Sequence, residues 1–133
     1  MSKIETIKIK CLKCEHKFRS DFYTSVNVTL NPELKEKILN GKINEKKCQK
    51  CGTFVQIQQA ILYHDMKNEI LIWIHWLSDE EMNRFSKEEK ENSRNILKTR
   101  YINDLGDLDF IFNNYRKEVI FGLSELNDKL KEM

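Results

Sequence analysis

The hydrophobic pattern of the first forty residues predicts two strands and one short helix. Residues 4–9 alternate imperfectly between polar and apolar types, and residues 17–30 are rich in aromatic and β-branched side chains. Both patterns are typical of strands. The pair Asn31-Pro32 marks the beginning of a helix and Asn40-Gly41 marks its end, because proline suits the first helical position and glycine suits the end. We therefore expect a helix over 32–39.

A β-hairpin is expected in the middle of the chain. Apolar side chains dominate residues 54–63 and again residues 70–77, and residues 64–68 (HDMKN) have the composition of a turn. The return strand carries both tryptophans, Trp73 and Trp76.

The segment after this hairpin is polar. Residues 78–81 (SDEE) have the pattern of a capping box and predict the beginning of a helix. Residues 86–95 contain no apolar side chain, and their charges can pair four residues apart along a helix. We interpret residues 86–95 as an exposed helix or a linker, and nothing specific supports a charged docking surface there.

The last third of the chain has the pattern of an amphipathic helix. Apolar side chains recur there at steps of three or four, which places them on one helical face: Leu108, Phe112, Tyr115, Val119, Leu123, Leu126 and Leu130. Gly122 weakens such a helix by roughly 1 kcal/mol relative to alanine. We favour packing of this helix on its own domain over a role as a dimerisation or partner helix.

Composition bounds the class of protein. The chain has 133 residues, of which 40% are hydrophobic and 33% charged, and this balance argues against disorder. We expect an α+β protein in which a zinc-ribbon-like antiparallel β domain with an inserted short helix (1–77) is followed by C-terminal helices (78–133) packed on it. The beginning of the chain has no apolar core of a signal peptide, and the longest apolar run, residues 70–77, is eight residues including His75, against about 20 for a membrane span. We therefore expect a cytoplasmic protein.

All four cysteines of the chain stand in two matched pairs. Cys11 and Cys14 form one C-x-x-C motif, and Cys48 and Cys51 form the second, after a spacer of 33 residues. Two intervening residues let a tight turn direct both sulfurs at one metal ion, so this is the pattern of two zinc knuckles. The spacer exceeds the roughly 15–20 residues of simple ribbons, and the predicted strand and helix over 17–39 account for its length.

Structural Zn²⁺ is our preferred interpretation of these cysteines, with iron the less favoured metal. Thiol redox chemistry is the second alternative, but a thioredoxin-like motif normally precedes a helix in a βαβ unit and neither pair does. Four thiolates would close the coordination shell, which disfavours a catalytic zinc.

Charge is divided unevenly along the chain. Residues 1–52 hold twelve Lys and Arg against six Asp and Glu, whereas residues 53–133 hold eleven against fifteen. Lys13, Lys47 and Lys50 flank the knuckles. We favour the interpretation that they compensate the negative charge of the thiolates, and the alternative is a surface for nucleic-acid phosphates.

No motif in the chain identifies a catalytic site. His16 is close to Cys14 and is read as a turn residue rather than a ligand, and His75 as an outward-facing strand residue. His64 and Asp65 are neighbours on a predicted strand, so they point to opposite faces, and Asp65 is read as a turn-shaping residue. There is no phosphate-binding glycine loop and no spare cysteine nucleophile. We assign no catalytic residue and leave an enzymatic activity open, with a non-enzymatic role preferred.

These motifs together resemble the CpXC domain family of bacteria and archaea. The resemblance rests on both cysteine knuckles, on segments 31–35 (NPELK) and 40–44 (NGKIN), and on segment 62–65 (LYHD), whereas residues 78–133 look less similar. The proline of the family name is absent, since Leu12 and Gln49 stand in its place. The resemblance implies a zinc-ribbon-like domain without an established biochemical activity.

Three classes of function follow as hypotheses. The preferred one is a zinc-binding interaction module that recruits a protein partner through the C-terminal helix or the Trp73/Trp76 hairpin, with a homodimer through that helix as one form. The second is a zinc ribbon that binds nucleic acid with its basic N-terminal half. The third is a thiol redox or metal-responsive switch.

Overall fold

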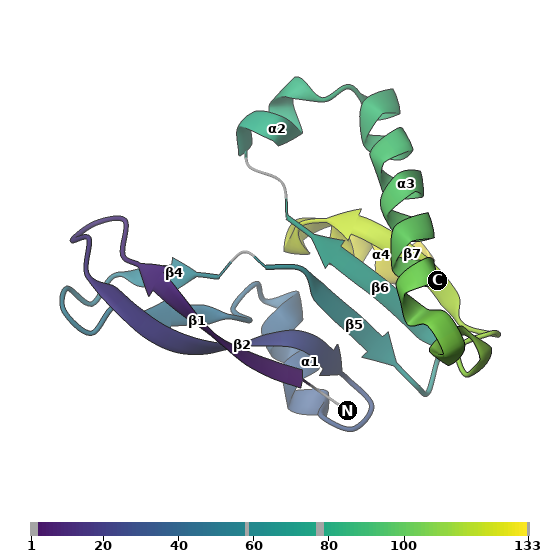
Figure 1. The fold of residues 1–133 in the computed structure, drawn as a ribbon, viewed down its shortest axis with the longest axis horizontal. Helices are drawn as coiled ribbons and strands as arrows, with labels where there is room; N and C mark the ends of the chain where they lie inside the picture. Colours follow the sequence, from purple (N-terminus) through teal and green to yellow (C-terminus); the bar gives the residue numbers. More distant parts are fainter. Residues whose placement is uncertain (1–2, 58, 77–78, 133) are drawn as a thin grey trace.

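A mixed five-stranded β-sheet forms the centre of the computed structural model, which describes residues 3–57, 59–76 and 79–132 (Figure 1). The strands in the order in which they lie in the sheet are β1 (Lys3–Lys10), β2 (Lys17–Asn27), β5 (Ile61–Asp65), β6 (Ile70–His75) and β7 (Arg116–Phe121). The first hairpin, β1–β2, and the middle hairpin, β5–β6, are antiparallel, as expected.

The sheet is not antiparallel throughout, which corrects the expectation of an antiparallel β domain. Strand β2 is parallel to β5, and β6 is parallel to β7. A parallel pair requires a crossover connection, and the chain makes two. The first carries helix α1 (Pro32–Leu39), and the second carries helices α2 (Asp79–Arg84) and α3 (Lys87–Leu105).

Helix α1 has the predicted bounds. Asn31 is its N-cap residue, Pro32 is at its first turn, and Asn40 is its C-cap, after which Gly41 takes a φ of 72°. Leu34 and Ile38, one turn apart, are its buried residues. Their spacing directs one stripe of the helix onto the sheet.

The larger hydrophobic core lies on the face of the sheet that α1 covers. Ile70, Ile72 and Ile74 alternate along β6 toward this face, as do Ile61 and Tyr63 on β5. The short C-terminal helix α4 (Leu126–Glu132) covers the same face with Leu126, and Leu130 packs against it.

The opposite face of the sheet carries a smaller core beneath α3. Leu71, Trp73 and Val119 are its buried residues. The partly buried apolar side chains of α3 pack on them: Leu97, Tyr101, Ile102 and Leu105. Figure 1 shows α3 crossing this side of the sheet. Residues 87–95 belong to α3 and Ser86 is its N-cap, which confirms the helical alternative for this segment. Trp73, expected to be available to a partner, is 6% exposed and stacks on Tyr101 with ring centroids 5.4 Å apart.

The prediction of one amphipathic helix over residues 108–130 is wrong. This segment contains a 3-10 helix (Gly106–Phe110), β7, a second 3-10 helix (Leu123–Glu125) and α4. The positions spaced by three and four are divided between the two faces of the sheet: Phe112, Tyr115 and Val119 lie on the α3 side, and Leu123, Leu126 and Leu130 lie on the α1 side. Gly122, with a φ of 79°, separates the two groups.

A second, two-stranded sheet pairs β3 (Glu45–Lys47) with β4 (Phe54–Gln56) in antiparallel register. The expected strand over 54–63 is therefore two strands, β4 and β5. Asn44 joins the small sheet to the large one, since its side chain accepts from Tyr23 N (2.7 Å) and donates to Tyr23 O (3.0 Å). Its own carbonyl accepts from Ile57 N at 2.9 Å.

Within the described ranges, no helix is long and apolar enough to cross a membrane. The capping box expected at residues 78–81 begins at Ser78, which is outside the described residues.

Candidate metal centre

The first cysteine pair forms the tip of the β1–β2 hairpin. Cys11 directly follows β1, and its backbone N–H donates to His16 O at 2.9 Å. Glu15 N donates to Cys11 O at 2.8 Å, and Glu15 has a φ of 62°. These bonds close a tight loop that turns both cysteine side chains toward the same side.

The second pair repeats this geometry at the tip of the β3–β4 hairpin. Cys48 N donates to Thr53 O at 2.8 Å, and Gly52 N donates to Cys48 O at 2.9 Å. Gly52 has a φ of 75°, so it occupies the left-handed region that Glu15 occupies in the first loop. The chain thus builds the same knuckle twice, each at the turn between two antiparallel strands.

The two knuckles bring all four cysteine sulfurs together. The Sγ atoms lie within 4.8 Å of one another. The Cys11–Cys51 Sγ distance is 3.5 Å, and the Cys14–Cys48 Sγ distance is 3.6 Å, so each of these close contacts joins the two knuckles. A tetrahedral zinc ion with 2.3 Å bonds has sulfur–sulfur edges of about 3.8 Å. The donor set and its dimensions therefore fit a four-thiolate metal ion.

Burial differs within each knuckle in the same way. The first cysteine is enclosed, with Cys11 0% and Cys48 1% exposed. The second is more open: Cys14 is half-buried and Cys51 is exposed. A metal ion bound here is reached from solvent through the Cys14 and Cys51 side.

Hydrogen bonds distinguish the acidities of the thiols. The Thr53 hydroxyl, 3.2 Å from Cys51 Sγ, and the Thr53 backbone N–H lower the pKa of Cys51 to about 6. The Cys51 backbone N–H likewise lowers the pKa of Cys48. At Cys14 the His16 backbone N–H acts in the same direction, but burial and the neighbouring thiols outweigh it and raise the pKa to about 12. One sulfur of the cluster is therefore readily available as a thiolate, the form that binds metal.

The surface around the cluster is basic and partly apolar. Lys13, Lys47 and Lys50 are exposed. Leu12, in the first knuckle, is 92% exposed, and Phe54, just after the second, is 64% exposed. We call Leu12, Phe54 and these three lysines the knuckle surface.

The histidines lie apart from the metal ligands. The ring of His16 stacks on Phe18 with centroids 5.9 Å apart, and only its backbone contributes to the knuckle. His75 does not face outward as expected: its Nδ1 is 3.2 Å from the Tyr101 hydroxyl, beneath α3. Sequence reasoning missed this contact because α3 reaches the strand from a distant part of the chain.

His64 and Asp65 point to opposite faces of the sheet, as predicted. The His64 ring packs against Phe112 and Tyr115 on the α3 side, where burial lowers its pKa. Asp65 is 4% exposed and accepts from Asn68 N (3.1 Å) and from Asn68 Nδ2 (2.8 Å). The turn-shaping role predicted for Asp65 is confirmed.

Sequence reasoning did not single out Thr53 and Asn44. Thr53 is two residues after Cys51, where its hydroxyl bonds the sulfur, and this short spacing was the available signal. Asn44 has a φ of 58°, which asparagine tolerates better than most residues. Its sequence signal was an asparagine directly before a short strand.

Comparison with known proteins agrees with the motifs. The family model described as CpXC protein matches residues 9–133, so the chain belongs to this family. The match extends over residues 78–133 as well as over the segments with the cysteine motifs. Neither the curated proteins nor the solved structures that were compared with the chain gave a match.

Proposed function

We propose that this CpXC protein is a zinc-binding, non-enzymatic interaction module with a structural four-cysteine site. The observation that carries the proposal is the convergence of four sulfurs within 4.8 Å from two matched knuckles. A metal ion bound by all four has a closed shell, which suits a structural role rather than a catalytic one. In this proposal the β1–β2 and β3–β4 hairpins form a zinc-ribbon-like unit.

The metal supplies a link that the chain otherwise makes only weakly. The β3–β4 sheet pairs through three residue pairs and meets β2 through the Asn44 side chain. Binding free energy of a structural zinc site becomes folding free energy. The ion therefore holds the small sheet against the tip of the long first hairpin.

Elemental analysis of the purified protein tests this site first. We expect one Zn²⁺ per chain, and iron in its place would correct the identity of the metal. A strong chelator should lower the melting temperature and change the near-UV signal, and an unchanged melting curve would contradict a structural metal. Zinc release by reversible oxidation at physiological potentials would favour the thiol switch instead.

Cysteine variants separate metal loss from general damage. Cys14→Ser and Cys48→Ser should lower zinc content and stability together. Gln49→Ala, an exposed position between the second pair of cysteines, is the matched control and should keep both. If Gln49→Ala lost as much zinc and stability as the cysteine variants, the losses would come from disturbance of the turn and not from removal of a ligand.

We further propose that the knuckle surface contacts a protein partner. Exposed Leu12 and Phe54 offer apolar anchors at a rigid, metal-held tip. The surfaces first considered for a partner are less available, since Trp73 is covered by α3 and Leu126 is 0% exposed.

The partner hypothesis is tested with variants of matched exposure. Leu12→Ser and Phe54→Ser should abolish capture of a specific protein from the native cell. Phe110→Ser, at a side chain 87% exposed elsewhere on the chain, should leave capture unchanged. A partner lost equally from all three variants would contradict a role for the knuckle surface.

Nucleic acid is the second candidate, and the observation that favours it is the set of exposed lysines in the knuckle surface, Lys13, Lys47 and Lys50. Binding should be strongest at low salt, because phosphate contacts release counterions. We would measure the fluorescence anisotropy of a labelled DNA or RNA oligomer at ~50 mM salt. Lys13→Glu and Lys50→Glu should weaken binding and Lys37→Glu, on α1, should not, and no binding at this salt concentration would exclude the candidate.

A further inference from the structure

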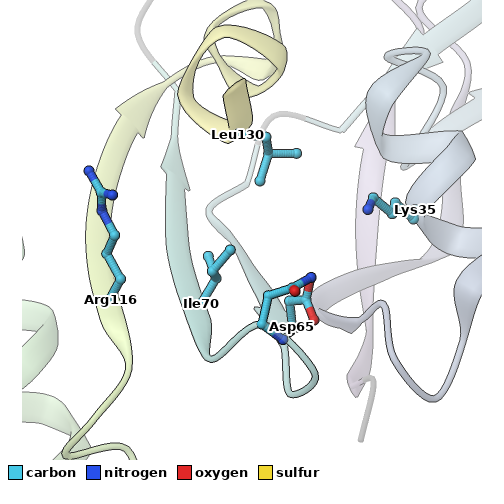
Figure 2. Close-up of a pocket in the computed structure, with 6 residues that line it drawn as sticks. Lys35, Asp65, Ile70, Arg116 and Leu130 are labelled. Atoms are coloured by element: carbon cyan, nitrogen blue, oxygen red, sulfur yellow. Dashed lines mark hydrogen bonds between the residues drawn. The ribbon is translucent and has the colours of Figure 1, made fainter. Parts of the chain in front are cut away.

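A cavity of about 380 Å³ opens between α1, α4 and one end of the sheet. Figure 2 shows Lys35 reaching toward it from α1 and Leu130 toward it from α4. The residues that line it are Lys35, Asp65, Asn68, Ile70, Arg116 and Leu130. We call this the α1–α4 cavity, and its volume is within the roughly 300–1,000 Å³ of small-molecule sites.

The floor of the cavity is one row of residues across three strands. Asp65 on β5 is the register partner of Ile70 on β6, and Ile70 is the register partner of Arg116 on β7. An acidic, an apolar and a basic side chain thus stand side by side at the same end of the sheet. Leu130 adds a second apolar wall opposite this floor.

The carboxylate of Asp65 is already occupied by the protein. One of its oxygens accepts from Thr29 Oγ1 (3.2 Å) and Asn68 N (3.1 Å), and the other accepts from Asn68 Nδ2 (2.8 Å). Its charge is thereby stabilised by the turn, and burial leaves it 4% exposed. Asp65 shapes the cavity and is poorly placed to take up a ligand cation.

The two cations of the cavity are less fully compensated. Among the described residues, Lys35 has no carboxylate within ion-pair distance, although its charge helps to lower the pKa of Asp65. Arg116 Nε lies 3.7 Å from Glu118, but the same Glu118 carboxylate also pairs with Lys129 (3.7 Å) and Lys98 (4.0 Å). The lining itself holds two cations, Lys35 and Arg116, against one carboxylate, Asp65, so its net charge is positive.

The surroundings of the cavity extend this positive charge. A neighbouring cavity of about 330 Å³ shares Lys35, Asp65 and Asn68 with it and adds Lys67. Two segments on which the family resemblance rests, residues 31–35 and 62–65, meet at these cavities, away from the cysteine cluster. Neither the metal site nor the knuckle surface uses them.

We propose that the α1–α4 cavity binds a small organic anion. Lys35 recognises its carboxylate or phosphate group, Arg116 on the opposite side of the cavity adds favourable charge, and its apolar part rests on Ile70 and Leu130. This site is separate from the metal centre and does not depend on the function proposed for it.

The test is an NMR titration of the zinc-loaded full chain with three probes of equal chain length: hexanoate, hexyl phosphate and hexanol. Hexanoate or hexyl phosphate should produce saturable shifts of the backbone amides of Asn68, Ile70 and Arg116. The probe that saturates at the lower concentration identifies the anionic group. Hexanol should bind at least tenfold more weakly, and equal binding of hexanol would overturn the anion site.

Variants of equal charge change identify the cations. Lys35→Gln should weaken binding about tenfold or more, as expected for the loss of a charged hydrogen bond, and Arg116→Gln should weaken it less because its charge acts from the opposite side of the cavity. Lys37→Gln, on the exposed side of the same helix, is the matched control and should change affinity less than twofold. Far-UV circular dichroism verifies folding, and Lys35→Gln remains decisive where Arg116→Gln disturbs the Glu118 cluster. Absence of saturable shifts, or equal weakening by Lys37→Gln, would overturn the proposal.

Discussion

Replacement of Asn44 should destabilise the protein more than its position in a surface loop suggests. Its side-chain amide bonds both the N–H and the carbonyl of Tyr23, at 2.7 and 3.0 Å. This is the pairing that a neighbouring strand would supply, at a point where β2 has not yet begun its pairing with β5 at Ser25. Asn44 is 5% exposed, so water replaces these bonds poorly.

Different substitutions of Asn44 separate the stability contributed by its hydrogen bonds from the strain of its backbone conformation. Asn44→Gly keeps the positive φ of 58° accessible and removes both hydrogen bonds, which should cost about 1–3 kcal/mol. Asn44→Ala adds the strain of a left-handed backbone, about 1 kcal/mol more. Asn44→Asp retains the acceptor for Tyr23 N but loses the donor to Tyr23 O, so its cost should resemble that of the glycine variant.

Urea unfolding of the zinc-loaded protein, followed by tryptophan fluorescence and far-UV circular dichroism, measures these differences. Asn92→Ala, at an exposed position of α3, is the control and should lie within about 0.5 kcal/mol of the original. If Asn44→Gly and Asn44→Ala both stay within that range, the side chain does not couple the two sheets. A glycine variant less stable than the alanine variant would refute the reasoning about the backbone.

Three further predictions follow from single contacts. Glu15→Gly should stabilise the first knuckle by about 0.5–1 kcal/mol in urea unfolding, because Glu15 has a φ of 62°; a loss of stability would contradict this. Tyr101→Ala should cost about 2–4 kcal/mol by removing the stack on Trp73, whereas Tyr101→Phe should cost only about 1 kcal/mol, for its hydrogen bond to His75; equal costs would exclude the stack as the main contribution. Burial opposes the ionisation of Asp65, but its hydrogen bonds and the charge of Lys35 lower its pKa below the ordinary value of 3.8. The ionised carboxylate therefore stabilises the folded protein above pH 3.8. This stabilisation is lost as the pH falls through the pKa that Asp65 has in the folded protein. The stability difference between the original and Asp65→Asn should therefore shrink below pH ~4, and a constant difference down to pH 2 would refute it.

The candidate metal centre could be predicted because its geometry is local. Each C-x-x-C motif contains the residues that close its own turn, as the matching bonds of Cys11 and Cys48 show. Only the contact between the two knuckles joins distant parts of the chain. That contact could be predicted because four cysteine sulfurs together make the ligand set of one metal ion. Helix α1 was predictable for the same reason, since Asn31, Pro32 and Gly41 are boundary signals within the helix's own sequence.

The C-terminal strand could not be predicted in this way. Val119, Ile120 and Phe121 are consecutive apolar residues, and a strand buried on both faces has such a run. The same residues also fit steps of three and four within a longer segment, so periodicity alone does not distinguish the two structures. The choice is made by β6, which offers a free edge for parallel pairing from Ile70 to His75.

The location of the exposed apolar surface depends on the same long-range pairing. Parallel pairing of β6 with β7 requires a crossover, and that crossover brings α3 over Trp73. Helix α3, which has no buried residue of its own, thus covers Trp73, the side chain that the sequence pattern suggested for a partner. Leu12, in the first knuckle, and Phe54, just after the second, stay 92% and 64% exposed. The knuckle surface is therefore more accessible to a partner than Trp73, and the variants Leu12→Ser and Phe54→Ser test whether a partner binds there.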